Sequence, residues 1–257
     1  MEAVMDTGTV DIHLGRSSVY SLLALAYAYP TAERLQRLRE DVAEDVGELG
    51  KGVVTPEIVG PVLEHLALPI ETLQRDYALV FTHTVSPDCP TYESAFSARD
   101  IFQQAQTMAD VAGFYSAFGL KVGGRERERA DHITAELEFM SFMALKLAYA
   151  IEYMGPEQVE IALDTQRTFL RDHLGRWGGS LGQRTASTAQ GQPLYRAVGE
   201  LLESWIDEEC RRLDTGPIDY LDDPAVPLPE QDDAVCGGPA ESTAFIGFDD
   251  IQEVAKK

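Results

Sequence analysis

Apolar residues recur at helical spacing along most of the chain. Near the start, Val19, Leu22, Leu23 and Ala26 occupy the i, i+3, i+4 and i+7 positions of one helix face, and Pro30 follows. The clearest pattern is a later run of six apolar residues whose spacings alternate between four and three. These residues are Ile133, Leu137, Met140, Ala144, Leu147 and Ile151. This pattern predicts a helix with a continuous apolar seam packed against its neighbours.

Helix breakers divide residues 16–213 into further expected segments. Thr31 is expected to cap a short charged helix, and the strongest internal breaker is the pair Pro87 and Pro90, which predicts a loop. No run shows sustained alternation of β-branched residues, so we predict an all-α fold, a single-domain helical bundle. The other expected elements are a Gly-rich break at 47–52, helices at 56–66, 70–83, 94–117 and 156–177, a long Gly/Ser/Thr-rich loop at 178–191, and a last helix from 194.

The charge balance excludes some classes of partner. The chain has 21 Lys+Arg against 43 Asp+Glu, a formal net charge of −22. Nucleic-acid backbones and anionic lipids are bound by clustered basic residues, so neither is expected as a partner. Cys89, Cys210 and Cys236 are far apart and odd in number, which fits neither a disulfide framework nor a zinc ribbon.

The sequence also bears on location. The first dozen residues contain no Lys or Arg, so the basic region of a secretory signal is missing. The most apolar stretch, Phe139 to Met154, is interrupted by Lys146 and Glu152 and is too short for a bilayer core of about 30 Å. We therefore expect a cytoplasmic protein without stable membrane insertion.

The composition changes at Asp214. From there to Lys257 the chain carries eleven acidic residues and two lysines, a net charge of −9, together with five prolines. We therefore expect a helical domain over 1–213 and an irregular, acidic, Pro-rich tail over 214–257. Within the tail, residues 244–255 are apolar enough to dock on the domain. The tail is interpreted either as an aid to solubility or as a regulatory segment.

Two segments carry candidate chemistry. In the first, DCPTYESAF (88–96), Glu93 and Ser94 lie at the expected start of a helix, where either could act as a cap. Alternatively, Tyr92 and Glu93 line a pocket, with Cys89 as a packed thiol nearby. The observations at this stage leave both interpretations open.

The second segment is ERERADHITAELEFM (126–140). Asp131 occupies the expected N-cap of the long helix, Glu128 precedes it by three residues, and His132 and Glu136 lie one turn apart on one face. A cap, an ion pair with a neighbouring arginine, or a hydrogen-bonded core histidine would explain these residues structurally. The spacing of His132 and Glu136 is also that of helical metal ligands, although no third ligand has comparable placement. An all-helical metal- or nucleotide-dependent hydrolase using Asp131, His132 and Glu136 is therefore the alternative.

Taken in order, several segments resemble one family. RSSVYSLLALAYAYP, RDYALVFTHTVSPDCPTYESAF, ERERADHITAELEFMSFMALKLA, FLRDHLGRW and PLYRAVGELLESWIDEE are similar to the TorD/DmsD/NarJ-like redox enzyme maturation chaperones, over residues 16–213. The acidic Glu-x-Pro-Asp-His signature of that family corresponds to Glu128–His132, with Ala130 in place of the proline. Its Tyr-x-Glu-like element corresponds to Tyr92 and Glu93.

The resemblance implies a function without catalysis. It implies a cytoplasmic chaperone that binds the apo catalytic subunit of a molybdopterin oxidoreductase, or its twin-arginine leader, and assists insertion of the molybdenum cofactor. It implies no permanently bound cofactor or metal, and it leaves open weak contact with guanine nucleotide or molybdopterin guanine dinucleotide. The protein is expected to be a monomer or a homodimer.

The predicted client-binding residues combine negative charge with apolar surface. Carboxylates suit arginines of a leader because the two groups form charge-assisted hydrogen bonds. Phe139 and Met143 could supply an adaptable apolar wall, with core filling as the structural alternative. The full predicted set is Tyr92, Glu93, Glu128, Asp131, His132, Glu136, Phe139 and Met143.

Overall fold

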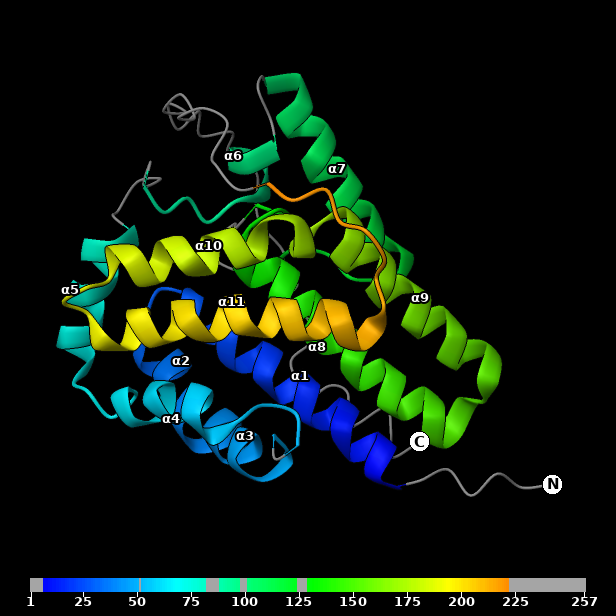
Figure 1. Cartoon of the computed structure of the whole chain (residues 1–257), viewed down its shortest axis with the longest axis horizontal. Helices are drawn as coiled ribbons and strands as arrows, with labels where there is room; N and C mark the ends of the chain where they lie inside the picture. Colours follow the sequence, from blue (N-terminus) through cyan, green and yellow to red (C-terminus); the bar gives the residue numbers. More distant parts are fainter. Residues whose placement is uncertain (1–6, 51, 82–87, 98–100, 124–128, 222–257) are drawn as a thin grey trace.

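The computed structural model describes residues 7–50, 52–81, 88–97, 101–123 and 129–221 (Figure 1). Within these ranges the regular structure is helical and the only strand-like pairing is one isolated bridge, so the predicted all-α class is confirmed. The helices are α1 (Thr7–Tyr27), α2 (Ala32–Arg37), α3 (Ala43–Leu49), α4 (Pro56–His65), α5 (Ile70–Phe81), α6 (Glu93–Ser97), α7 (Ile101–Ala117), α8 (Ile133–Tyr149), α9 (Pro156–Asp172), α10 (Leu174–Thr188) and α11 (Pro193–Leu213). Two π-helical turns, η1 (Leu38–Val42) and η2 (Ala150–Met154), extend α2 and α8.

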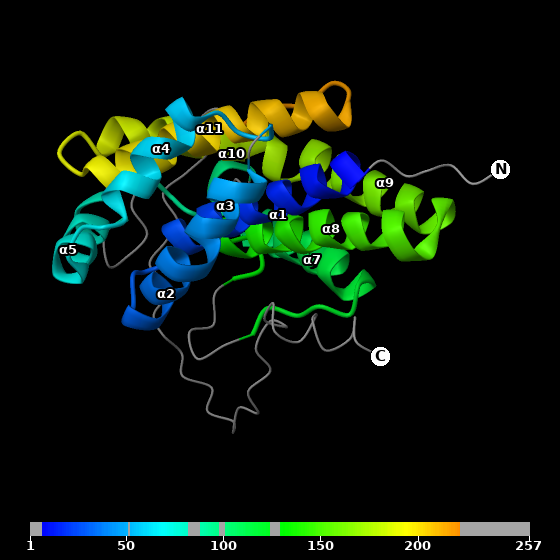
Figure 2. The same ribbon diagram turned by 90° about the horizontal axis from the view of Figure 1, so that it is seen from below.

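The core lies between two layers of helices. Figure 2 shows α10 and α11 side by side above α1, α8 and α9, with α7 on the far side. α1 packs along α8, where the hydroxyls of Ser17 and Ser21 both bond to Ser141, at 3.0 and 2.9 Å. The predicted seam of α8 is buried along its whole length, because α1 covers one side of the helix and α9 another.

One buried ion pair links three of these helices. Arg16 of α1 and Glu209 of α11 are both fully buried, with Nη2 and Oε2 2.6 Å apart. Arg16 also donates to Gln166 of α9 at 2.7 Å, and its Nη1 lies 3.0 Å from Nδ1 of His13. Burial and the charge of Arg16 lower the pKa of His13 to about 4, so this histidine is neutral at pH 7.

The predicted loop at 178–191 is wrong, because this stretch forms most of helix α10. One of its glycines, Gly182, faces the backbone of α11 at very short distance. A Cβ atom on Gly182 would lie 2.6 Å from the backbone nitrogen of Glu203. Glycine therefore serves here to bring two helix backbones together, and the packing gained outweighs its poor helix propensity of about 1 kcal/mol. Local composition cannot reveal this, since the partner helix comes later in the chain.

Other boundaries differ in smaller ways. Thr31 caps α2 as expected, accepting a hydrogen bond from the Arg34 amide at 3.2 Å. Gly47 lies inside α3, so the predicted Gly-rich break begins later than expected, and the chain turns at Gly52, where φ is +90°. The helix expected to reach Trp177 ends at Asp172, because His173 has a non-helical backbone and separates α9 from α10. The helix expected over 94–117 is described as α6 and α7, and 98–100 lie outside the described residues.

The residues after α11 run back over the helical layer. The amide of Leu221 donates to the carbonyl of Arg176 at 2.8 Å, and Arg176 Nε donates to the carbonyl of Asp219 at 3.0 Å. Residues 222–257, which include Cys236 and the apolar segment 244–255, lie outside the described residues. Among the helices that the structure describes, none is both long and apolar enough to cross a membrane.

Candidate functional site

The two segments with candidate chemistry meet in space. Tyr92 and His132 form an antiparallel bridge. The amide of Glu93 donates to the carbonyl of Asp131, and the amide of Ile133 donates to the carbonyl of Thr91, both at 2.9 Å. The starts of α6 and α8 are therefore joined backbone to backbone. We call the joined residues Thr91–Ser94 and Arg129–Ile133 the loop clasp.

Asp131 is the centre of the loop clasp. Its side chain is fully buried, and its Oδ2 accepts a hydrogen bond from the amide of Ser94 at 3.1 Å. Arg129 donates two hydrogen bonds to the same carboxylate, from Nε to Oδ1 at 3.0 Å and from Nη2 to Oδ2 at 2.9 Å. The guanidinium group also lies over the ring of Tyr92, 4.8 Å from its centroid. Asp131 therefore caps α6, and the prediction that it caps α8 is wrong.

The N-cap of α8 is His132. Its backbone is extended, and its Nδ1 accepts a hydrogen bond from the amide of Thr134 at 3.2 Å. Burial and the positive charge of Arg129 lower the pKa of His132 to about 3, so the ring is neutral and can accept this bond. The ring also packs edge-on against Tyr92, with 4.9 Å between centroids.

Glu93 connects the loop clasp to the break between α9 and α10. It is buried, and its Oε2 lies 3.0 Å from Nδ1 of His173. Burial raises the pKa of Glu93, while the hydrogen bond and charge of His173 act in the opposite direction. Because His173 interrupts the two helices, this contact holds the junction of α9 and α10 against the start of α6.

Glu136 extends the same network into the core. It is fully buried, and its Oε2 accepts a hydrogen bond from the indole nitrogen of Trp177 at 3.2 Å. In the part of the chain that the structure describes, Oε1 has no hydrogen-bond partner. Burial raises the pKa of Glu136 well above its usual value, and the charges of Glu93 and Asp131 add to the effect. Burial therefore favours the uncharged form of Glu136.

The remaining predicted residues are placed differently. Phe139 and Met143 are fully buried, and the ring of Phe139 packs against Tyr115 and Phe169 with centroids 5.0 and 4.7 Å away. They are core residues and present no exposed wall, so core filling is the correct interpretation. Met140 is buried in the same way. Glu128 lies outside the described residues.

Two important partners were given no role by the sequence analysis. His173 and Trp177 both belong to the segment FLRDHLGRW, which contributed to the family resemblance. Nothing local in this segment indicates that Glu93 and Glu136 are their partners, and His173 itself lies between two helices. Those contacts join residues 80 and 41 positions apart in the chain.

The geometry does not favour the hydrolase alternative. Asp131 binds Arg129 and Ser94, His132 bonds to Thr134, and Glu136 bonds to Trp177, so the three side chains have separate partners. Among the described residues, no group of three or more His, Cys, Asp or Glu side chains is arranged to hold a metal ion.

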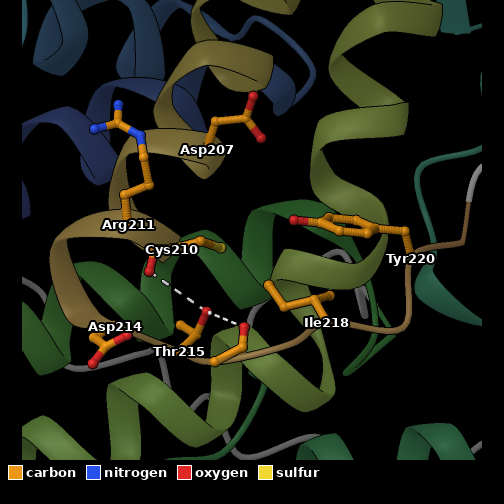
Figure 3. A pocket seen from close by; sticks show the side chains of 8 residues that line it. Asp207, Cys210, Arg211, Asp214, Thr215, Ile218 and Tyr220 are labelled. Carbon is orange, nitrogen blue, oxygen red and sulfur yellow. Dashed lines mark hydrogen bonds between the residues drawn. The ribbon is translucent and has the colours of Figure 1, made fainter.

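Cavities in the described part of the chain lie away from the loop clasp, and two of them border α11. The first, of about 570 Å³, is formed by the end of α11 and the segment after it, and is lined by Asp207, Cys210, Arg211, Asp214, Thr215, Gly216, Ile218 and Tyr220. Figure 3 shows the Arg211 guanidinium pointing away from Tyr220. The second, of about 530 Å³, lies between residues 52–58 and α11. Neither is lined by a residue of the predicted site.

The fold and the match to a family model identify the protein family. The described part is a helical bundle in which the two candidate segments form a buried, hydrogen-bonded network. The family model described as nitrate reductase delta subunit matches residues 35–182, more than half of the chain. The chain belongs to this family, and its resemblance to the TorD/NarJ-like redox enzyme maturation chaperones is confirmed at the family level.

Similar proteins carry consistent names. The chain is 30% identical to the perchlorate reductase assembly chaperone protein of Dechloromonas aromatica, over 82% of this chain and 95% of that protein. It is 27% identical to the chlorate reductase assembly chaperone protein of Ideonella dechloratans, over 76% of this chain and 90% of that protein. It is also 28% identical to the chaperone protein TorD of Vibrio cholerae serotype O1, over 55% of this chain and 62% of that protein.

Proposed function

We propose that this protein is a dedicated assembly chaperone for the catalytic subunit of a molybdopterin-dependent oxidoreductase. It binds the apo subunit and releases it once the molybdenum cofactor is inserted, and it has no catalytic turnover of its own. The observation that carries the proposal is family membership, together with relatives that are named as assembly chaperones of perchlorate and chlorate reductases and align along most of the chain.

The loop clasp supports this role by holding an exposed surface in place, and its buried residues do not contact the client directly. Asp131, His132, Glu93 and Glu136 are buried. Asp131 joins the starts of α6 and α8, whereas the side chains of Glu93 and Glu136 connect these starts to His173 and Trp177. Tyr92 is partly exposed and stands at the rim of the clasp. We assign contact with the client to this rim and to the adjoining predicted residue Glu128, and we assign to the buried residues the task of fixing the rim in place.

We also propose that the client presents basic residues to the chaperone in the cytoplasm, such as those of a twin-arginine leader. The net charge of −22 supports this, because an acidic protein attracts a basic segment at long range and speeds its encounter. The same attraction weakens as salt is added, since exposed charges are screened within about 10 Å at 0.1 M ionic strength.

A deletion strain tests the proposed function. The client oxidoreductase is purified from strains with and without this protein, and its molybdenum content and reductase activity are measured. We expect both to be lost without the chaperone, to return with the unchanged gene, and to return only partly with the Asp131→Ala/His132→Ala variant. An Asp164→Ala variant, which changes an exposed residue of α9, serves as the control. Full molybdenum loading of the client in the deletion strain would refute the proposal.

A further inference from the structure

A cluster of large apolar side chains is exposed at the far end of α8. Tyr149, Tyr153 and Met154 are 40%, 65% and 48% exposed. The rings of the two tyrosines pack against each other with 4.9 Å between centroids and a tilt of 42°. We call these three residues the η2 patch. Grouped aromatic and methionine side chains with this exposure are typical of protein interaction sites, whereas single exposed apolar residues are ordinary.

The η2 patch stands on a rigid support. Tyr149 is the last residue of α8, and the π-helical turn η2 carries Tyr153 and Met154. The turn is closed by a hydrogen bond from the amide of Gly155 to the carbonyl of Ala150 at 3.1 Å, and Ala150 and Ile151 are buried beneath it. π-helical turns insert one extra residue into a helix and occur often at functional sites. Here the turn places the apolar side chains outward while its own base stays in the core.

Acidic residues lie next to the η2 patch in the chain. Glu152 lies within the turn, and its hydrogen bond and charge raise the pKa of Tyr153. Glu157, in the first turn of α9, is exposed. Within the described ranges, neither carboxylate has an ion-pair partner. The N-terminal end of α1, with the exposed Asp11, reaches the same end of the molecule (Figures 1 and 2).

We propose that the η2 patch binds an apolar segment of the client polypeptide that is flanked by lysine or arginine. The proposal rests on the proposed function, since it takes the client as the partner. The two rings supply apolar area and π-faces for a cation, Met154 adapts to the shape of the segment, and Glu152 and Glu157 pair with its basic ends.

The position of the patch gives it a distinct role. The loop clasp lies at the start of α8 and the η2 patch at its end, and a helix of 17 residues is about 25 Å long. One client chain can therefore contact both places at once. Two weak contacts on one rigid helix give an overall affinity well above that of either contact alone.

A peptide-binding experiment tests the inference. The probe is a fluorescein-labelled peptide with a Leu-Leu-Phe-Leu core and two lysines at each end, titrated with the full chain and followed by fluorescence anisotropy. One comparison peptide has glutamates in place of the lysines, and another has serines in place of the apolar core. We expect the lysine-flanked peptide to bind at least tenfold more tightly than either.

Matched variants locate the binding to the patch. Tyr153→Ser and Met154→Ser should each lower the affinity for the lysine-flanked peptide by about tenfold. Glu152→Gln should lower that affinity several-fold, and only at low salt. Leu79→Ser is the control, because Leu79 is 60% exposed on α5 at the opposite end of the molecule (Figure 1). Circular dichroism melting of every variant verifies that it is folded.

Three results would overturn the inference. The first is that the Tyr153→Ser and Leu79→Ser variants bind the lysine-flanked peptide with equal affinity. The second is that the glutamate-flanked peptide binds as tightly as the lysine-flanked peptide. The third is that the chain self-associates in sedimentation and Tyr153→Ser abolishes this, which would make a second copy of the chain the occupant of the patch. The deletion strain separates this inference from the proposed function. If the client needs no chaperone, the proposed function fails. If the client needs it but matures fully with the Tyr153→Ser protein, only the role of the η2 patch fails.

Discussion

Gly182 of α10 and Gly199 of α11 pack backbone against backbone. A Cβ atom on Gly182 would lie 2.7 Å from the carbonyl oxygen of Gly199, and one on Gly199 would lie 2.6 Å from that of Gly182. Both distances are far below van der Waals contact, so neither position accepts a side chain unless the helices move apart. The contact joins the two helices that form the upper layer in Figure 2.

We therefore expect Gly182→Ala to lower the free energy of unfolding by about 1–3 kcal/mol, because the cost of overpacking exceeds the gain in helix propensity. Gly179→Ala is a matched control in the same helix, since nothing lies within 4 Å of a Cβ atom there. It should stabilise the protein by about 0.5–1 kcal/mol. Urea unfolding measures both variants, and equal stability of the two would contradict the close packing.

The buried pair Arg16–Glu209 predicts a strong non-additive effect. Glu209→Leu leaves the fully buried Arg16 without a carboxylate partner and should cost about 3–5 kcal/mol of stability. Arg16→Met should cost less, because Glu209 keeps a second partner in Arg212 at 3.3 Å. The double variant should cost much less than the two single changes together, because no unpaired charge remains. The exposed pair Arg196–Glu200 is the control, and Arg196→Ala should change stability by less than about 0.5 kcal/mol. Simple additivity in a double-mutant cycle would disprove this account.

Glu136 makes stability depend on pH. In the unfolded chain this carboxyl loses its proton near pH 4.5, whereas burial raises its pKa in the folded protein well above that. Its contribution to stability is therefore present below pH 4.5 and is lost as the pH rises toward the folded pKa, by about 1.4 kcal/mol per pH unit. Glu136→Gln keeps an oxygen to accept the Trp177 bond but cannot ionise.

The Glu136→Gln variant should match the unchanged protein near pH 4.5 and become more stable than it as the pH rises above 4.5. Urea unfolding at several pH values checks this, with Glu200→Gln on the surface of α11 as the control for loss of one negative charge. Parallel pH profiles for the Glu136→Gln variant and the unchanged protein would show that Glu136 is ionised in the folded state.

The loop clasp predicts a local effect of Asp131→Asn. The asparagine oxygen can still accept the hydrogen bond from the Ser94 amide, but Arg129 loses its ion pair with the carboxylate. This loss should lower the free energy of unfolding by about 1–3 kcal/mol. The amides of Glu93 and Ile133 should exchange their hydrogens at least tenfold faster, because both donate across the clasp. Asp164→Asn, in an exposed pair with Arg167, should change neither quantity. Unchanged protection of the two amides would show that Asp131 does not hold the clasp.

Much of the fold could be predicted from local patterns. The seam of α8 and the Thr31 cap both depend on residues within a few turns of each other, and the structure confirms them. α10 was missed because its glycines were interpreted by their local propensity, whereas their role depends on Gly199 in the next helix. A Gly-rich stretch indicates a loop only when no partner helix approaches it.

The candidate site was predicted in composition but not in arrangement. Tyr92, Glu93, Asp131 and His132 were all singled out from their own segments, and they do come together. However, Glu93, Asp131 and His132 are buried, so they stabilise the loop clasp and do not form an exposed binding surface. The same burial placed Phe139 in the core, while the exposed apolar surface lies at the end of α8.

By itself the sequence determined the helical class, the main helix breaks and the family, because periodicity, caps and motifs are properties of neighbouring residues. Only the tertiary structure decided which partner each carboxylate has, which carboxyl groups have raised pKa values, and which apolar side chains meet solvent. These properties depend on distances between residues far apart in the chain, such as Ser94 and Asp131 at 37 positions and Glu93 and His173 at 80. Burial then sets the energy of each charge, and burial is a consequence of how the helices pack.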